Sequence, residues 1–169
     1  MQETHSKIFF SKNNVNPLDD STKPVIITDN FSTPENIGHI IRLAANVGAL
    51  KVVVLRSENL RKSKIKKTAG TAIDHIPLVF SETDRLQEHI PEDYTFTALE
   101  TAEGAKNIFN TSLPDKLALV LGNEKYGISD EMLKLCNLKV YIPMPGTVKS
   151  MNVTHAASVC LFEWLRQHS

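Results

Sequence analysis

The sequence lacks an excess of charge of either sign and lacks any long apolar run. Its 169 residues include 19 lysines and arginines against 19 aspartates and glutamates, so the formal net charge is zero. A neutral balance excludes a highly basic coat for nucleic acid but leaves room for a local basic patch. The polar start, Met1 to Asn14, holds no apolar stretch of signal-peptide length, and nothing in the chain approaches a membrane span. We therefore expect no membrane partner.

Cysteine is scarce as well, with only Cys136 and Cys160. Neither lies at metal-ligand spacing from a partner, and two thiols in a chain of this length do not make a disulfide framework. A reducing cytosol is the simplest setting, so we expect a cytoplasmic protein. The six histidines do not pair at ligand spacing either, and we expect no metal site.

Two glycine motifs of nucleotide-binding proteins are missing. The dinucleotide fingerprint G-x-G-x-x-G is absent. Gly122 and Gly127 have the spacing of a phosphate loop, but Ile128 stands where the lysine of that loop must follow. These gaps argue against the rival class of dinucleotide-dependent oxidoreductases and nucleotide triphosphatases. The loop at Gly122 suits close backbone contact with a ligand, or is a plain strand-to-helix turn.

The length suits one compact domain. We interpret residues 1–23 as a polar leader with one short edge strand at Ile8–Phe10, and residues 24–169 as the folded domain. The β-branched run Val25–Thr28 predicts a buried strand, and Thr33 followed by Pro34 predicts the start of a helix that stops at Gly48.

Strands and helices go on alternating along the rest of the chain. The patterns predict strands over Val52–Leu55, Ile76–Phe80, Tyr94–Leu99, Leu117–Leu121 and Lys139–Ile142, and helices over Asn59–Lys67, Thr83–His89, Ser129–Leu135 and from Val153 to Trp164. Such alternation indicates an α/β fold with a mostly parallel sheet flanked by helices. Ligands of these sheets bind at the carboxyl ends of strands, which directs attention to the segments after Thr28, Leu99, Leu121 and Ile142.

Three segments hold polar residues that the core pattern does not explain. In N-I-G-H-I-I-R-L-A-A-N-V-G, Arg42 lies off the apolar stripe, either as a solvated arginine or as a clamp for a phosphate, and Asn36 is a turn residue or a ligand contact. The second segment, L-V-L-G-N-E-K-Y-G-I-S, ends at Ser129 as a helix cap. In the third segment, I-P-M-P-G-T-V-K-S-M-N-V-T-H-A-A, either Ser150 or Asn152 is a plain helix cap or a functional residue. A helix cap alone does not explain the long rigid loop that precedes the helix.

Together the three segments resemble the SPOUT superfamily of RNA methyltransferases, specifically its SpoU or TrmH-type branch. They occur in the order and separation typical of that family, and the likeness covers roughly residues 24–167. The resemblance implies a SPOUT fold with a C-terminal trefoil knot, a homodimer with its active site near the interface, and S-adenosylmethionine as methyl donor. Knots are otherwise nearly absent from proteins, so periodicity alone does not predict one.

The resemblance also implies roles for particular residues. Arg42 matches the catalytic arginine of the family, and Asn36 matches the asparagine of its first motif. Glu124 and Asn152 match polar residues of its later motifs. Met151 stands where leucine is common, a volume-conserving exchange. The full expected sets are Arg42, Asn36, Glu124, Ser150 and Asn152 for catalysis, and Leu99, Gly122, Asn123, Ile142, Met144, Ser150 and Met151 for the cofactor.

The implied reaction is attack of a ribose 2′-hydroxyl of RNA on a sulfonium methyl group. Arg42 is no ordinary base, since a guanidinium stays protonated in proteins. We expect it to orient the phosphate of the target nucleotide and to stabilise oxyanion character. Removal of the proton falls to that phosphate or to water, and the sequence leaves this open.

RNA contact requires positive charge. Besides Arg42, the densest basic run holds Arg61, Lys62, Lys64, Lys66 and Lys67, which form either a solvated helix face or a phosphate-binding patch. Transfer RNA is the first expectation for the substrate, because a minimal domain suits a compact RNA. Ribosomal RNA is the alternative, and so is a non-catalytic RNA-binding protein with the same fold.

Overall fold

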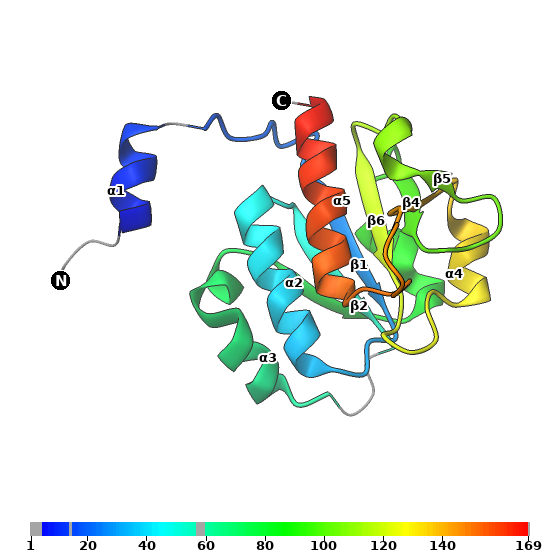
Figure 1. Ribbon diagram of the computed structural model, residues 1–169. Coiled ribbons are helices and arrows are strands. Elements are labelled where there is room, and N and C mark those ends of the chain that lie inside the picture. The colour runs from blue at the N-terminus through cyan, green and yellow to red at the C-terminus, as the bar shows by residue number, and fades with distance from the viewer. Residues whose placement is uncertain (1–4, 14, 57–59, 169) are drawn as a thin grey trace.

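The fold is built on one seven-stranded sheet in which every neighbouring pair of strands is parallel (Figure 1). This computed structural model describes residues 5–13, 15–56 and 60–168. The strand order is β3-β2-β1-β6-β4-β7-β5. The strands are β1 (Val25–Asp29), β2 (Lys51–Leu55), β3 (Leu78–Ser81), β4 (Thr95–Leu99), β5 (Lys106–Asn107), β6 (Leu117–Leu121) and β7 (Leu138–Tyr141). The expectation of an α/β fold with a parallel sheet is confirmed.

Helices cover both faces of this sheet. The helices α2 (Pro34–Val47), α3 (Lys62–Ala69) and α5 (Val153–His168) lie on one face, and α4 (Asp130–Leu135) lies on the other with the 3₁₀ segment η2 (Thr83–His89). Successive residues of a strand point to opposite faces, so Ile26 packs toward α2 and α5 while Val25 and Ile27 pack toward η2 and α4. All residues of β1 and β6 are buried, as expected for strands that are covered on both sides. Two further 3₁₀ segments are η1 (Gly70–Asp74) and η3 (Ile108–Asn110).

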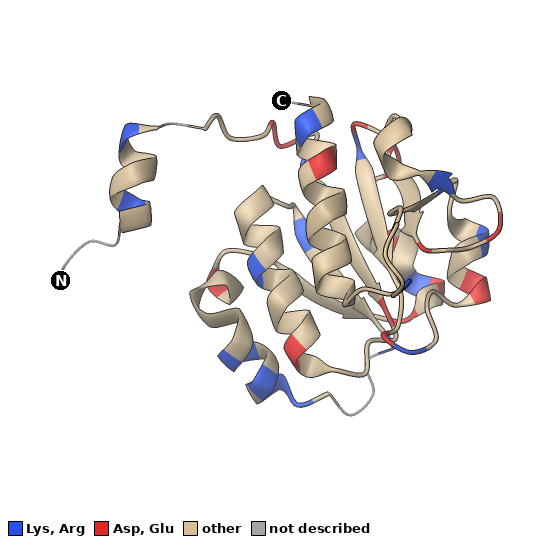
Figure 2. Ribbon diagram, viewed as in Figure 1, with Lys and Arg blue, Asp and Glu red and all other residues tan. Residues whose placement is uncertain are grey.

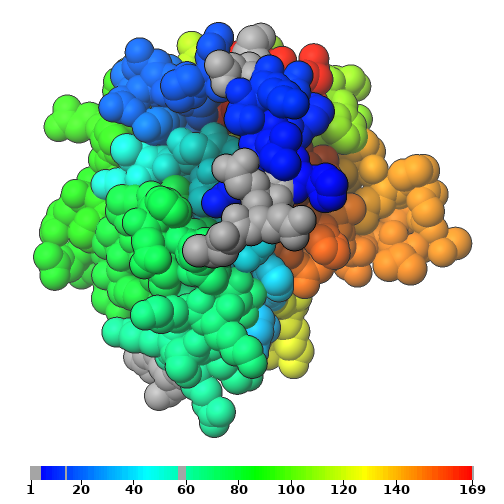
Figure 3. Space-filling view, turned by 90° about the vertical axis from the view of Figure 1, so that its left-hand side faces the viewer, coloured from blue at the N-terminus to red at the C-terminus, as the bar shows by residue number. Residues whose placement is uncertain are grey.

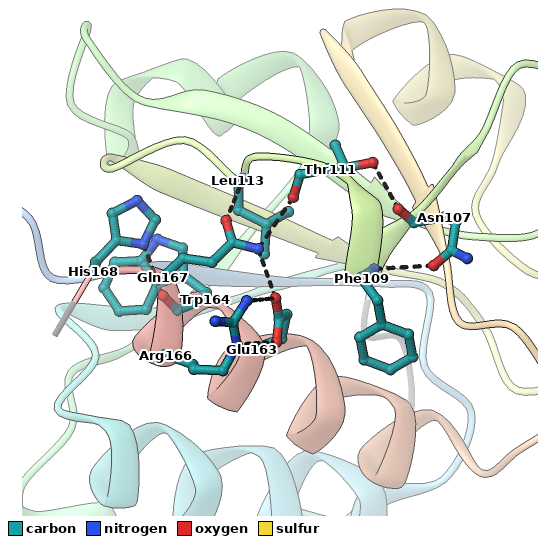
Figure 4. Close-up of polar contacts among 9 residues, drawn as sticks. All are labelled: Asn107, Phe109, Thr111, Leu113, Glu163, Trp164, Arg166, Gln167 and His168. Atoms are coloured by element: carbon teal, nitrogen blue, oxygen red, sulfur yellow. Dashed lines mark hydrogen bonds and ion pairs between the residues drawn. The ribbon is translucent and has the colours of Figure 1, made fainter.

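The C-terminal end of α5 is fixed to the segment that leads into β6 (Figure 4). Trp164 is fully buried, and its indole Nε1 donates a hydrogen bond to the Pro114 carbonyl at 2.9 Å. Gln167 Oε1 accepts the N–H of Leu113 at 2.8 Å, and Gln167 Nε2 donates to the Thr111 carbonyl at 3.1 Å. These bonds hold α5 in place, and its other end starts next to the loops at the carboxyl edge of the sheet.

The predicted edge strand at Ile8–Phe10 is wrong. These residues belong to the helix α1 (His5–Lys12), which buries none of its residues and lies apart from the sheet (Figure 1). A strand must pair with a neighbour to satisfy its backbone groups, whereas a helix satisfies them internally. A segment held away from the sheet therefore forms a helix despite its β-prone side chains.

Smaller differences concern the ends of elements. The strand β3 begins at Leu78, two residues later than predicted, and β4 begins at Thr95, one residue later. The two-residue strand β5 is too short for its pattern to show. Helix α3 begins at Lys62, while the predicted start at Asn59 lies outside the described residues. Among the described residues no helix is long and apolar enough to cross a membrane.

Candidate functional site

A cavity of about 450 Å³ opens at the carboxyl ends of β4, β6 and β7, which are neighbours in the sheet. Its wall is made by the loops that follow these three strands and by the first turn of α5. This is the edge at which parallel sheets bind ligands. All seven residues expected to hold a cofactor line the cavity: Leu99, Gly122, Asn123, Ile142, Met144, Ser150 and Met151.

The loop after β6 folds back tightly on itself. The N–H groups of Asn123 and Gly127 each donate to the other's carbonyl at 2.9 Å. A Cβ on Gly122 would collide with the backbone of Gly127 and Ile128, so only glycine fits at position 122. The close approach that the sequence suggests at Gly122 is thus made first of all by the loop's own backbone.

Glu124 connects this loop to the start of α2. Its Oε2 accepts the N–H and the hydroxyl of Ser32 at 3.0 and 2.8 Å, and its Oε1 accepts the Thr33 N–H at 3.0 Å and the Asn36 amide at 2.8 Å. Thr33 was the expected cap of α2, but its side chain makes no capping bond. The Glu124 carboxylate fills that place and complements the positive end of the helix.

These bonds determine the ionisation of Glu124. Burial alone raises the pKa of a carboxyl group, but the hydrogen bonds from Ser32 and Asn36 outweigh burial and lower the pKa of Glu124 to about 2. Glu124 is therefore a carboxylate at neutral pH and has no proton to give.

Asn36 and Asn152 extend the connection to the third segment. Asn36 is buried, and its Oδ1 accepts a long bond of 3.5 Å from Asn152 Nδ2. Asn152 Oδ1 in turn accepts the N–H of Thr154 at 2.8 Å, so Asn152 does cap α5. Glu124, Asn36 and Asn152 thus form a chain of hydrogen bonds that connects the three segments at the edge of the cavity.

The outer wall of the cavity is the long loop between β7 and α5. It projects from the molecular surface in orange in Figure 3, and Ser150 and Met151 on it are exposed. Lys149 Nζ donates to the Met144 carbonyl at 2.7 Å and so closes the loop on itself. Two carboxylates, Glu100 and Glu124, and one lysine line the cavity.

The structure does not bring Arg42 to this cavity. Arg42 is exposed and lines a separate groove of about 230 Å³ between α2 and α5, with His39 and His155 among its neighbours. Its Nη1 lies 3.4 Å from where a Cβ on Gly70 would stand. Within the described part of the chain no carboxylate lies within ion-pair distance of Arg42. The expected catalytic residues are therefore divided. Glu124, Ser150 and Asn152 line the cavity. Asn36 does not line it but bonds to Glu124 and Asn152, and Arg42 lines a separate groove.

The expected basic patch gathers on and just before α3 (Figure 2). Lys64 is engaged, because its Nζ lies 2.8 Å from Glu35 Oε1 on α2. Lys62 Nζ lies 5.2 Å from the centre of the Phe80 ring, a cation–π contact. All five basic residues of the patch are exposed: Arg61, Lys62, Lys64, Lys66 and Lys67.

Glu100 is a site residue that the sequence analysis missed. It directly follows β4 and lines the cavity, and its carboxylate accepts the N–H of Ile128 at 3.0 Å and that of Thr101 at 2.8 Å. An acidic residue immediately after a predicted strand was the available signal.

Burial raises the pKa of both thiols, Cys136 and Cys160, to about 12, so neither is a thiolate at neutral pH.

Comparison with known proteins places this geometry in a family. The model of the SpoU rRNA Methylase family matches residues 23–162. A 23S rRNA (guanosine-2'-O-)-methyltransferase, RlmB, of Haemophilus influenzae is 32% identical over 158 residues, which are 92% of this chain and 62% of the relative. The protein of the same name from Xylella fastidiosa is 32% identical over 86% of this chain and 59% of the relative. The chain thus spans about three fifths of the length of the curated relatives it matches.

Solved structures share the fold. The SpoU methyltransferase AviRb from Streptomyces viridochromogenes has a TM-score of 0.79 at 23% identity, over 92% of this chain and 63% of that one. A structure described as giving insights into the 2-OH methylation of C/U34 on tRNA has a TM-score of 0.76 at 24% identity and covers 99% of both chains. At these identities the likeness shows the fold alone. Because the family model matches most of this chain, the chain belongs to the SpoU rRNA Methylase family.

Proposed function

We propose that this chain transfers the methyl group of S-adenosylmethionine to a ribose 2′-hydroxyl of RNA in the cytoplasm. The observation that carries the proposal is the cavity at the carboxyl ends of β4, β6 and β7. Two of the three segments of the family resemblance line it, and Glu124 and Asn152 bond to Asn36 of the third segment. A structural neighbour, AviRb, is described in complex with the cofactor AdoMet.

The cavity fits this cofactor in size, polarity and charge. About 450 Å³ is within the usual range of roughly 300–1,000 Å³ for small-molecule sites. Leu99, Ile142, Met144 and Met151 supply apolar surface for a purine ring. Glu100 and Glu124 make the lining favourable for a positively charged sulfonium and unfavourable for phosphates. The same charges argue against the rival nucleotide-dependent classes.

We assign different roles to the polar residues. When bound, S-adenosylmethionine supplies an activated methyl group on a positively charged sulfur. Gly122, Asn123, Ser150 and Met151 hold the cofactor at the loops, while Glu124, Asn36 and Asn152 fix those loops and α2 relative to one another. Proton removal is left to a phosphate of the RNA or to water, because the low pKa of Glu124 arises from bonds that already occupy its oxygens.

For the substrate we propose ribosomal RNA rather than the transfer RNA first expected. The relatives at 32% identity carry names of 23S rRNA methyltransferases, whereas the structure concerned with tRNA is 24% identical and supports only the fold. Transfer RNA stays the comparison substrate in the test below.

We further propose a homodimer in which Arg42 completes the site of the other subunit. Arg42 is exposed, has no carboxylate partner in the described chain and opens into a groove of its own, so a single chain leaves it without a function. In a symmetric pair, the surface around α2 and α5 can place Arg42 beside the partner's cavity.

The first test is transfer of tritiated methyl from S-adenosylmethionine to ribosomal and transfer RNA transcribed in vitro. Arg42→Ala is expected to lower kcat by about 10²–10³, the usual effect of removing one preorganised donor, with cofactor affinity by calorimetry unchanged. Arg85→Ala, which removes an exposed arginine paired with Glu88, is the matched control. No label in any RNA would favour the non-catalytic alternative.

A second test asks in which subunit Arg42 acts. Arg42→Ala keeps the cavity, and Gly122→Ala keeps Arg42 but distorts the cavity loop. The two variants are mixed in equal amounts so that about half of the dimers contain one subunit of each. If Arg42 serves the partner's cavity, each mixed dimer has one working site of its two, and the mixture regains about a quarter of the wild-type activity. If the mixture stays as inactive as each variant, Arg42 acts in its own subunit and this part of the proposal fails.

A further inference from the structure

An exposed aromatic ring, Tyr126, belongs to a loop that lines the cavity. Tyr126 belongs to the loop after β6 and is 77% exposed, the second most exposed of the large hydrophobic side chains in the described part of the chain. The neighbouring residues Gly122, Asn123, Glu124 and Gly127 all line the cavity. A large ring left in water at such a place costs hydrophobic free energy that a ligand would recover.

The backbone that carries Tyr126 is held firmly. Asn123 Oδ1 accepts the N–H of Tyr126 at 3.1 Å and that of Lys125 at 2.9 Å. The paired bonds between Asn123 and Gly127 close the loop on both sides of the ring. The ring is therefore presented by a rigid turn, which limits the entropy that a bound partner must remove.

The charge around the ring suits nucleic acid. Lys125 Nζ lies 5.1 Å from the centre of the Tyr126 ring, and among the described residues no carboxylate lies within ion-pair distance of it. The nearby carboxylates of Glu124 and Glu100 already accept internal hydrogen bonds. An aromatic ring next to a free cation is the combination that binds single-stranded nucleic acid, with the base on the ring and the phosphate on the charge.

A second pair of the same kind lies along the same edge of the sheet. Lys62 lies over the partly exposed ring of Phe80, which is the next-to-last residue of β3. The strands β3 and β6 are separated by β2 and β1, so their ends are about 14 Å apart at roughly 4.8 Å per strand. One RNA strand running along the carboxyl edge can therefore reach both pairs.

We propose that Tyr126, supported by Lys125, is a stacking platform for an unpaired base of the RNA, next to the ribose that is methylated. This inference rests on the proposed function and names the form of its substrate: a nucleotide in a single-stranded loop or one turned out of its helix. A base in a continuous duplex is stacked on its neighbours and leaves no face for Tyr126.

Binding of labelled oligonucleotides tests the platform apart from catalysis. Fluorescence anisotropy at low salt compares oligo(rA) decamers with the same strand paired to oligo(rU). Tyr126→Ala is expected to weaken single-strand binding about 5- to 150-fold, the range for loss of one base–aromatic stack, whereas Tyr126→Phe and Tyr126→Trp keep it. Phe109→Ala is the matched control, because this ring is 49% exposed beside the C-terminal end of α5 (Figure 4). Equal loss in Tyr126→Ala and Phe109→Ala, or equal loss for duplex and single strand, would overturn the platform.

Methyl transfer to ribosomal RNA transcripts then connects the platform with the reaction. Tyr126→Ala is expected to raise KM for RNA while cofactor affinity by calorimetry and the dimer mass by light scattering stay unchanged. If the wild type methylates RNA and Tyr126→Ala leaves KM unchanged, the platform is wrong and the proposed function stands. If the wild type transfers no methyl but oligonucleotide binding still depends on Tyr126, the proposed function fails instead. Dissociation of a dimer in Tyr126→Ala would make the ring a protein contact and overturn the inference.

Discussion

Glu124 shows how one side chain at the edge of the cavity affects both folding and the site. Its two oxygens accept four hydrogen bonds from Ser32, Thr33 and Asn36. These donors are 88 to 92 positions away in the sequence, so no local pattern could reveal the connection. The sequence singled out Glu124 and Asn36 as expected site residues, but gave no sign that they bond to each other.

We predict that Glu124 makes stability depend on pH in acid. Its pKa is lowered from 4.5 to about 2 in the folded chain, so the stabilisation is complete above pH 4.5 and is lost as the pH falls toward 2. Glu124→Gln places an amide against the same donors and is expected to cost about 1–3 kcal/mol of unfolding free energy near neutral pH. Urea unfolding from pH 7 to pH 2.5 should show this difference shrinking below pH 4.5.

The control for this prediction is Glu103→Gln, on an exposed residue with no hydrogen-bond partner in the described chain. A constant difference between wild type and Glu124→Gln at all pH values would contradict the assigned role of the carboxylate.

At the scale of elements, a single glycine determines how closely α2 and α3 pack. A Cβ on Gly38 would lie 2.5 Å from Thr68 Cβ and 2.9 Å from the Ile65 carbonyl. Alanine in the middle of a free helix is more favourable than glycine by up to about 1 kcal/mol. Here we predict the reverse: Gly38→Ala should lower the unfolding free energy by about 1–3 kcal/mol, because the helices must move apart.

Gly146→Ala is the matched control, since nothing lies within 4 Å of a Cβ at that position. Denaturant unfolding of the two variants measures the difference. A Gly38→Ala protein as stable as the control would show that α3 does not rest on α2 as described.

Local signals predicted the regular elements well where one residue type decides the outcome. Pro34 begins α2, Gly48 follows its end, and Ser129 caps α4 by accepting the N–H of Met132. They failed at α1, whose structure depends on the absence of a neighbouring strand, and at β5, which has two residues. Boundaries and isolated segments follow from tertiary packing, which a sequence pattern does not contain.

At the scale of the whole molecule, the sequence predicted many residues of the cavity but not the position of Arg42. The cavity residues follow strand ends, and a parallel sheet brings such ends to one edge. Arg42 lies in the interior of α2, facing the groove with α5, and its place relative to a cavity depends on how subunits associate. The trefoil knot, too, stays a prediction from the resemblance, since neither periodicity nor spacing contains chain threading.

The basic patch on α3 gives the last prediction, on how the whole molecule binds RNA. Lys64 is a poor choice for a test because it already pairs with Glu35, whereas no acidic residue pairs with Lys66 or Lys67 in the described chain. Reversing both charges in Lys66→Glu/Lys67→Glu should lower affinity for ribosomal RNA fragments and leave cofactor affinity alone. Each lost phosphate contact should reduce the slope of log affinity against log salt by roughly 0.7–0.9.

Lys134→Glu is the control for the patch, because Lys134 is an exposed lysine on α4, which covers the other face of the sheet. A net charge effect alone would weaken RNA binding about equally per reversed lysine in both variants. A local contact weakens it only on α3, and only there does the salt dependence become shallower. Since the molecule as a whole is neutral, equal losses on both faces would mean that α3 is merely a solvated helix and that RNA is held elsewhere.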